Sequence, residues 1–241
     1  MEALVARLRF PFYSIAKRSY QIRPSHLLPS PSALKGALAK GIILLREDKG
    51  EKMDEIAEKT LKELNSKLLY VGAKPYKSIV VKSPILLKRL RTLESSSGPE
   101  KSDAMRREYT FSREILAIYV FRELTEEEKT LYLKATYLID QLGDTESLGS
   151  VVEAQWVEVK KGTYPLNTYL PLSKIRISVS GIIDAMLESP SFTKEEKEVP
   201  YVLPLSEREY KRTIYYEEKP IQGISSNHYL EVFGEVVGLW I

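Results

Sequence analysis

The side chains best suited to proton transfer near neutral pH are two histidines, His26 and His228. His26 lies in a proline-rich stretch that also carries several cations. There it could act as the general base of a metal-independent ribonuclease, although a lone histidine in such a loop more often caps, stacks or binds phosphate. In the ribonuclease interpretation, the side chains that would stabilise the transition state or assist are Lys17, Arg18, Lys35, Tyr13 and Tyr20.

Other common catalytic patterns do not occur in the sequence. The chain has no cysteine, which excludes disulfides, thiolate metal sites and a cysteine nucleophile. Asp144 and Glu146 share a loop, but no further carboxylate stands out to complete a two-metal site. The sequence contains neither a GxxxxGK[ST] loop nor a GxGxxG after a strand. We therefore expect a protein without enzymatic activity, metal or cofactor, with catalysis by His26 as the alternative.

A phosphate site is predicted where the first helix begins. Ser30 is a favoured N-cap residue, and Pro31 fits the first helical position. Free N–H groups and the helix dipole favour an anion at such a point, which Ser32 and Lys35 would flank. The alternative is a plain capped helix.

Positive charge is concentrated near the N-terminus. Residues 3–46 contain eight basic side chains and no acid, although the net charge of the whole chain is only +3. Residues 114–153 reverse this pattern, with nine acids against three bases. The asymmetry favours one face for a polyanion and another for water or protein neighbours, unless the bases cluster on a solvated surface by chance.

Length and composition indicate a folded chain. With 241 residues, of which 43% are hydrophobic, it can bury a substantial core in one large domain or two small ones. It lacks a secretory h-region and any apolar run near the roughly 18 residues of a membrane span. We expect a cytoplasmic protein with no membrane partner. Glutamate outnumbers aspartate and lysine is abundant, a usage that resembles that of hyperthermophiles.

Hydrophobic periodicity predicts the order of the elements up to residue 160. A strand over 2–10 carries Arg7 and Arg9 on its polar face, and a basic loop, 11–30, follows. Helices are predicted over 31–46 and about 52–67, then strands over 67–71 and 76–81 that a Gly-Ala-Lys-Pro turn separates. A central strand over 114–121, a helix from Thr125 to about Leu142 and a strand over 151–160 complete this part.

Residues 83–109 predict a protruding hairpin. Their tip, SSSGPEKSD, has the composition of a turn or linker. Basic arms around a flexible tip could lie along a phosphate backbone, and a disordered surface excursion is the alternative. The basic residues of the two arms are Lys88, Arg89, Arg91, Arg106 and Arg107.

The predicted fold class is α+β. With the helix at 52–67 set aside, the order is βαββαβ, the ferredoxin-like motif that also underlies RRM domains. Its sheet would expose Arg7 and Arg9, without the aromatic pair of an RRM. This core spans residues 1–160, with the basic β-hairpin inserted at about 83–112, and a β-rich C-terminal extension, 161–241, packs on it. Strand candidates there are 174–180, 199–204, 212–217 and 229–240, and the tail at 236–241 is a candidate for docking to a neighbouring subunit.

Two motifs carry a resemblance to a known family. Residues 28–38, LPSPSALKGAL, open the first helix, and residues 139–147, IDQLGDTES, follow the helix that begins near Thr125. In their order and spacing they resemble the fifth family of CRISPR-associated (Cas) proteins, the subunit that caps the 5′ handle of crRNA in type I Cascade complexes. The basic hairpin falls where that family inserts its thumb. The resemblance spans residues 1 to about 155 and is greatest for type I-A.

The resemblance implies a protein of the RAMP superfamily, with a ferredoxin-like core and a thumb that grips crRNA in antiviral defence. It would belong to a ribonucleoprotein with the backbone and large subunits of Cascade, and would meet target DNA through that complex. Cations, His26 and Ser32 would hold the handle, Tyr20 would stack on a base, and Gly143 would shape the pocket wall through its backbone. The implied RNA-binding residues are Lys17, Arg18, Tyr20, Arg23, His26, Ser32, Lys35, Lys88, Arg89, Arg91, Arg106, Arg107 and Gly143.

Two departures from related ribonucleases favour a role without catalysis. The type I-C branch of the family cleaves precursor RNA with a tyrosine, a lysine and a histidine, and no Lys-His pair stands in a matching place. The dedicated processing ribonuclease of the superfamily has a C-terminal glycine-rich loop, which PIQGISSNHY and FGEVVG do not reproduce. The sequence thus predicts a capping subunit, with a precursor-crRNA endoribonuclease and a structural assembly subunit as alternatives.

Overall fold

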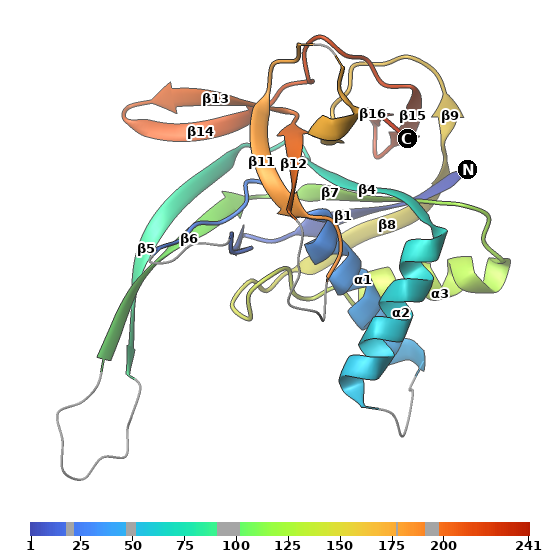
Figure 1. The fold of residues 1–241 in the computed structure, drawn as a ribbon, viewed down its shortest axis with the longest axis horizontal. Helices are drawn as coiled ribbons and strands as arrows, with labels where there is room; N and C mark the ends of the chain where they lie inside the picture. Colours follow the sequence, from blue (N-terminus) through green and yellow to red (C-terminus); the bar gives the residue numbers. More distant parts are fainter. Residues whose placement is uncertain (18–21, 47–51, 91–101, 177, 191–197) are drawn as a thin grey trace.

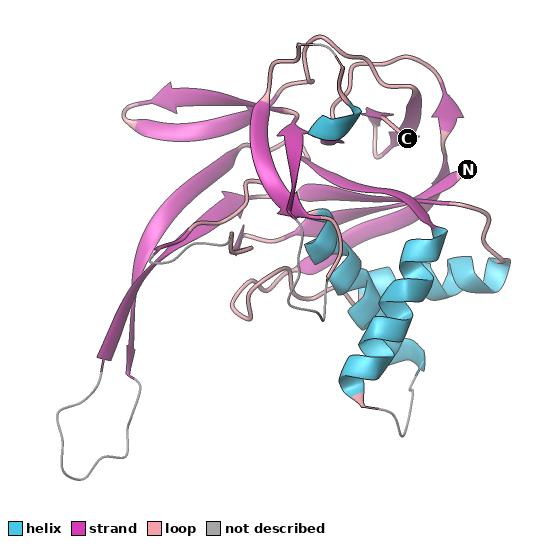
Figure 2. Ribbon diagram, in the orientation of Figure 1, coloured by secondary structure: helices cyan, strands magenta, loops and turns pink. Residues whose placement is uncertain are grey.

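The computed structural model describes residues 1–17, 22–46, 52–90, 102–176, 178–190 and 198–241 (Figure 1). Three predicted site residues, Arg18, Tyr20 and Arg91, lie outside the described residues, as does most of the predicted hairpin tip. Lys88 and Arg89 lie in a described strand, but their side chains do not belong to the described part. Figure 2 shows the α-helices gathered on one side of a mainly β structure.

Four antiparallel strands form the central sheet, in the order β4-β7-β1-β8. Every residue of β7 is buried, because this strand has a neighbour on each side and a packed layer on each face. The predicted strands at 2–10, 114–121 and 151–160 are thereby confirmed. The strands are β1 (Glu2–Arg9), β4 (Leu68–Pro75), β7 (Ile115–Phe121) and β8 (Ser150–Glu158).

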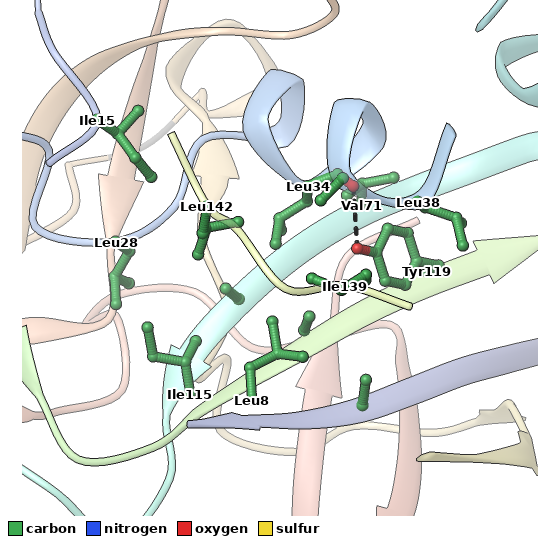
Figure 3. Packing of buried hydrophobic residues seen from close by; sticks show 14 of the residues in the cluster. Leu8, Ile15, Leu28, Leu34, Leu38, Val71, Ile115, Tyr119, Ile139 and Leu142 are labelled. Carbon is green, nitrogen blue, oxygen red and sulfur yellow. Dashed lines mark hydrogen bonds between the residues drawn. The ribbon is translucent and has the colours of Figure 1, made fainter. Parts of the chain in front are cut away.

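The helices cover one face of this sheet and enclose the main core. They are α1 (Pro31–Arg46), α2 (Met53–Lys67) and α3 (Glu126–Tyr137). The hydroxyl of Tyr119 in β7 donates a hydrogen bond to the carbonyl of Leu34 in α1, at 3.0 Å (Figure 3). Gly41 allows α1 to approach α3, because a Cβ at this position would overlap the carbonyl of Ala135. Packing of these helices on the sheet therefore fixes the position of the α1 N-terminus.

The opposite face of the central sheet is covered by the C-terminal hairpin. Strands β15 (His228–Val232) and β16 (Glu235–Leu239) pair with each other, and β9 (Lys160–Lys161) pairs with β15. Leu230, Val237 and Leu239 pack with apolar residues of β1 and β7. The prediction that this sheet face is exposed is wrong. The candidate docking tail at 236–241 lies largely in the paired strand β16, with Val237 and Leu239 buried. Covering an apolar sheet face with a second layer removes it from water, which lowers the free energy of the folded chain.

A second sheet contains the predicted hairpin. Its strand order is β13-β14-β5-β6-β2, and β3 pairs with β6 in parallel. Strands β5 and β6 are paired along their whole length and project away from the body of the molecule (Figure 1). The strands are β2 (Phe12–Tyr13), β3 (Ile22–Arg23), β5 (Val80–Leu90), β6 (Ser102–Ser112), β13 (Leu205–Tyr210) and β14 (Thr213–Glu218).

The C-terminal third packs against both sheets. It contains β10 (Leu170–Pro171), the 3-10 turn η1 (Leu172–Lys174), β11 (Ile182–Leu187) and β12 (Glu198–Leu203). Tyr169 donates a hydrogen bond to the Pro29 carbonyl at 2.8 Å, just before α1. The buried ammonium of Lys74 in β4 contacts Glu218 at 2.7 Å and Glu235 at 2.6 Å. These contacts tie the C-terminal third to the central sheet.

Several predicted elements agree with the structure and others do not. The helix at 31–46 is confirmed with its exact bounds, and the strands at 199–204 and 212–217 lie within one residue of β12 and β14. The predicted Gly-Ala-Lys-Pro turn is wrong, because these residues continue β4 and pair with β7. Pro75 is tolerated there because β4 is an edge strand, so the missing N–H costs no hydrogen bond of the sheet. The helix predicted to Leu142 ends at Tyr137. The strand predicted at 174–180 is wrong, since the strand begins at Ile182, and β13 was not predicted.

Candidate nucleic-acid interface

The basic N-terminal loop, residues 11–30, lies along the base of the β5–β6 hairpin. Phe12 and Tyr13 of β2 pair with Phe111 and Thr110. Further along the loop, β3 pairs with β6 at Arg106 and Arg107. The loop is thus held twice on one strand, and the cations of loop and hairpin come from adjacent strands.

Hydrogen bonds hold the ends of this loop. The Tyr13 hydroxyl donates to the Leu27 carbonyl at 2.6 Å, and burial, followed by the charge of Asp184, raises the pKa of Tyr13 far above its ordinary value. The Thr110 hydroxyl donates to the His26 carbonyl at 2.8 Å. The Ser25 amide donates to a carboxylate oxygen of Glu108 at 3.0 Å. The loop is therefore shaped by buried polar groups rather than by its prolines alone.

Gly143 fixes the other side of the loop. It has a φ of +89° and forms a parallel bridge with Ser14. A Cβ at this position would lie 2.7 Å from the Ser14 carbonyl oxygen, so a larger residue would push the strand away. The Ser14 amide also donates to the Ser147 hydroxyl at 2.9 Å. The IDQLGDTES motif thus holds the basic loop through its backbone and a serine.

Arg107 joins the hairpin to the same motif. Its side chain is buried, forms an ion pair with Asp144 and lies 3.7 Å from a Glu146 oxygen. Tyr109, two residues along β6, donates a hydrogen bond to Glu146. Burial, followed by this hydrogen bond, raises the pKa of Tyr109. The two carboxylates that the sequence singled out therefore contact a guanidinium group of the hairpin.

His26 is a buried side chain with a partner that the sequence did not indicate. Only 4% of the residue is exposed, and its Nδ1 lies 3.1 Å from Oδ2 of Asp184 in β11. Lys17 forms an ion pair with the other oxygen of this carboxylate. Burial opposes ionisation of Asp184, but the hydrogen bonds and charges of His26 and Lys17 outweigh it and hold its pKa below the ordinary value. No local sequence pattern marks Asp184, because its role depends on contact between distant segments.

The start of α1 has the predicted cap, and Lys35 lines a small pocket beside it. The hydroxyl of Ser30 accepts the Ala33 amide at 3.2 Å, and Ser32 is 8% exposed. The pocket has a volume of about 170 Å³. Burial lowers the pKa of Lys35, and the charge of Glu188 opposes that shift. The polar residues that share the pocket with Lys35 are Asn65, Tyr70, Lys174, Glu188 and Tyr201.

The predicted cations differ in their access to solvent. Arg23 and Arg106 are exposed, while Arg107 is 1% exposed. The side chain of Lys17 is 30% exposed beside Asp184. The exposed cations of adjacent strands β3 and β6 are therefore the described candidates that a phosphate could reach directly.

The two arginines of β1 share a single buried acid. Glu114 lies 3.0 Å from Nε of Arg7 and 2.6 Å from a terminal nitrogen of Arg9. Arg7 also lies over the rings of Tyr76 and Phe233, at 5.3 and 5.9 Å from their centroids. Arg7 thus belongs to the interface between the central sheet and the C-terminal hairpin.

Among the described residues, no group of three or more His, Cys, Asp or Glu side chains lies close enough to hold a metal ion. None of the described helices is both long enough and apolar enough to cross a membrane.

The chain is similar to one curated protein over its whole length. It is 63% identical over 244 residues to "CRISPR-associated protein Cas5" of Methanocaldococcus jannaschii, and the alignment covers 100% of this chain and 99% of that protein. The search against protein-family models found no match.

Solved structures give a second comparison. A CRISPR protein from Archaeoglobus fulgidus superposes with a TM-score of 0.52 and 20% identity, over 98% of each chain, which shows a shared fold. A chain of a CRISPR RNA-guided surveillance complex aligns with a TM-score of 0.44 and 14% identity, over 90% of this chain and 91% of that chain.

Proposed function

Since the chain belongs to the Cas5 family of CRISPR-associated proteins, we propose that it is a non-enzymatic RNA-binding subunit of a CRISPR effector complex. In this role it caps the 5′ handle of mature crRNA in a type I complex, of type I-A or a related subtype, in antiviral defence. Its partners are then the crRNA, the backbone and large subunits of Cascade and, through the complex, target DNA.

One observation carries this proposal: the basic N-terminal loop and the basic hairpin meet at β3, on one edge of the second sheet. Strand β3 pairs with β6 in the register Ile22–Arg106 and Arg23–Arg107, so that Arg23 and Arg106, both exposed, stand on adjacent strands and point to opposite faces. Neighbouring strands in a sheet lie only about 5 Å apart. A single-stranded backbone that passes around this edge would therefore meet cations from both segments.

The topology supports the assignment of parts. The sheet order β4-β7-β1-β8, with α1 and α3 on one face, is what a βαββαβ ferredoxin-like core requires. In this interpretation β5 and β6 are the thumb, inserted between the core strands β4 and β7. Residues 161–241 are the extension, which covers the sheet face that RRM domains use for RNA.

The position of His26 supports a role without catalysis. A general base must reach a substrate hydroxyl directly or through one water molecule. The His26 side chain is 5% exposed and its Nδ1 faces a buried carboxylate, so the ring is suited to holding the loop in place. Lys17 then serves both the structure, through Asp184, and the phosphate-binding surface.

The test is a titration of labelled RNA with purified protein at 50 and 200 mM salt, with the products examined on a denaturing gel. The RNAs are a repeat-derived 5′ handle, a scrambled handle and an intact repeat. Four phosphate contacts to a single strand would weaken binding roughly 50-fold between the two salt concentrations. We expect tighter binding to the handle than to the scrambled RNA, a steep salt dependence and no cleavage.

Two outcomes would contradict the proposal. Cleavage of the intact repeat at one position without added metal, lost in a His26→Ala variant, would identify a ribonuclease. Equal and salt-insensitive binding to every RNA, both by the isolated chain and by the assembled complex, would favour the alternative of a structural assembly subunit.

A further inference from the structure

The second sheet carries a row of four apolar side chains on one face, three of which are aromatic. In an antiparallel pair, residues directly opposite each other point to the same side of the sheet. Tyr215 is opposite Val81, Val81 is opposite Phe111, and Phe111 is opposite Phe12. These four residues, from β14, β5, β6 and β2, therefore form one line across four strands, here called the aromatic row.

The aromatic row is accessible at one end. Phe12 is 36% exposed, and its ring lies 6.2 Å from that of Phe111 and 5.5 Å from that of Tyr109. Ile79, two residues before Val81, is 50% exposed. Exposed apolar side chains gathered on one face are typical of binding surfaces.

An open groove of about 430 Å³ runs along the middle of the row, at Val81 and Phe111. Val81 and Phe111 form its floor, together with Pro11 and Ile79. The charged groups that line it are Lys77 and Arg113, both exposed, and no acid lines it. An apolar floor between two cations suits a flat, uncharged ring attached to an anion.

The backbone at Lys77 is held in an unusual conformation. Its φ is +48°, in the left-handed region that residues other than glycine, asparagine and aspartate seldom adopt. The Lys77 ammonium lies 5.0 Å from the Tyr76 ring centroid. The turn between β4 and β5 thus keeps a cation at the rim of the groove despite the strain.

We propose that the aromatic row is a stacking site for unpaired RNA bases, whose phosphates contact Lys77 and Arg113. The inference rests on the proposed RNA-binding function and extends it, because exposed Arg23 is opposite Arg107, which lies on the same face of β6 as Phe111. Each nucleotide would place its base against Phe12 and Phe111 and its backbone towards the cations. Such stacking tolerates any base sequence, since every base has a π face.

Charge distinguishes RNA from a protein segment as the occupant. A second open groove, between α1 and α3, is lined by Leu45 and Leu131 but also by Glu126 and Glu127, which would repel phosphate. The groove at the aromatic row has the opposite charge. The exposed Arg23 of β3, on the same face of the second sheet, also favours the same RNA strand as the occupant.

The test combines protein variants with abasic RNA. Full-length protein is titrated with a handle RNA extended by spacer nucleotides, intact or with one base removed at each position in turn. In the wild type, removal of a stacked base weakens binding roughly 5- to 150-fold at one or two positions. In Phe12→Leu and in the double variant with Phe111→Leu, the intact RNA binds as weakly as the abasic RNA, so the effect of base removal at those positions disappears.

Matched controls separate stacking from loss of fold. Phe12→Tyr keeps a ring and should keep the abasic effect. Tyr210→Leu removes an aromatic residue that is 63% exposed on the same sheet but outside the row, and should change nothing. Lys77→Asn tolerates the left-handed conformation, and should reduce the salt slope by about one phosphate contact. Thermal unfolding of each variant checks that it is folded.

The results distinguish failure of the stacking site from failure of the proposed RNA-binding function. If the wild type binds handle RNA with salt dependence but Phe12→Leu leaves every abasic effect intact, the stacking site is wrong and the proposed function stands. If the double variant releases a partner subunit from the assembled complex at unchanged RNA affinity, the row docks protein instead. If neither the isolated chain nor the complex binds RNA through this chain, both proposals fall.

Discussion

The imidazole of His26 and the carboxylate of Asp184 face each other at 3.1 Å although 158 positions separate them in the sequence. Asp184 is 3% exposed and also pairs with Lys17, so one buried carboxylate from the C-terminal third holds two residues of the N-terminal loop. The loop therefore owes its shape to a strand that lies far beyond the family-like motifs.

Asp184→Asn should loosen the loop. The amide keeps the size of the side chain but removes the charge that Lys17 and His26 face. We expect a loss of about 1–3 kcal/mol in the free energy of unfolding at pH 7, measured by urea denaturation, and weaker handle binding. Asp140→Asn is the control, because its ion pair with Lys40 is solvent-exposed and should contribute less than about 1 kcal/mol. Equal effects of the two substitutions would contradict the assigned role of Asp184.

The same carboxylate predicts a pH dependence of stability. Its folded-state pKa lies below the ordinary value, so its stabilising contribution is complete above about pH 4 and is lost as the pH falls through the folded-state pKa. The difference in unfolding free energy between the wild type and Asp184→Asn should therefore be constant from pH 7 to about 5 and shrink below about 4. Denaturation curves across this range measure it. A difference that grows on acidification would show that the sign is wrong.

Gly143→Ala should disturb the basic loop more than a glycine substitution elsewhere. The added Cβ would meet the Ser14 carbonyl at 2.7 Å in a backbone with positive φ, so we expect a loss of about 2–4 kcal/mol. Gly234→Ala is a matched control, because Gly234 also has a positive φ, of +75°, but nothing lies within 4 Å of its Cβ position. It should cost about 1 kcal/mol. Thermal unfolding compares the two, and the excess in the first variant measures the contact with Ser14.

Neutralising the exposed cations should weaken RNA binding without loss of stability. Arg23→Gln and Arg106→Gln each remove one proposed phosphate contact, which should reduce the salt slope by about 1 and weaken binding to all RNAs alike. Lys62→Gln removes an equally positive charge from α2, where the side chain is 76% exposed, and should leave binding unchanged. If Lys62→Gln were as damaging as the other two, net charge rather than the loop and hairpin surface would account for the affinity.

Lys74→Met should separate the C-terminal third from the central sheet. Its ammonium is buried between Glu218 and Glu235, and burial raises the pKa of Glu218 even with this cation beside it. Removing the lysine leaves the two carboxylates without their common cation, so we expect a loss of about 3–5 kcal/mol. Restoration by Glu218→Gln and Glu235→Gln in the same chain would show that uncompensated charge, and not lost packing volume, is responsible. Urea denaturation at pH 7 measures all of these variants.

The elements that local chemistry specifies could be predicted from the sequence. Ser30 and Pro31 set the start of α1, Thr125 forms the predicted N-cap of α3, and the apolar run at 115–121 forms the fully buried strand β7. The basic segments and both motifs were likewise visible, because charge and turn residues are properties of the chain itself.

Other features depend on contacts between distant segments, and only the tertiary structure decided them. The Gly-Ala-Lys-Pro stretch extends as a strand because β7 offers it a partner, although its composition is that of a turn. Arg7 lies beside Glu114 and against the C-terminal hairpin, where strand periodicity alone places it in solvent; Arg9 shares Glu114 but stays 51% exposed. The pairing of His26 with Asp184 arises from contact between segments that no local pattern encodes. The same holds for the alignment of Phe12, Phe111, Val81 and Tyr215 across four strands. Local propensity selects helices and strands, whereas burial and pairing across the whole chain determine which side chains meet.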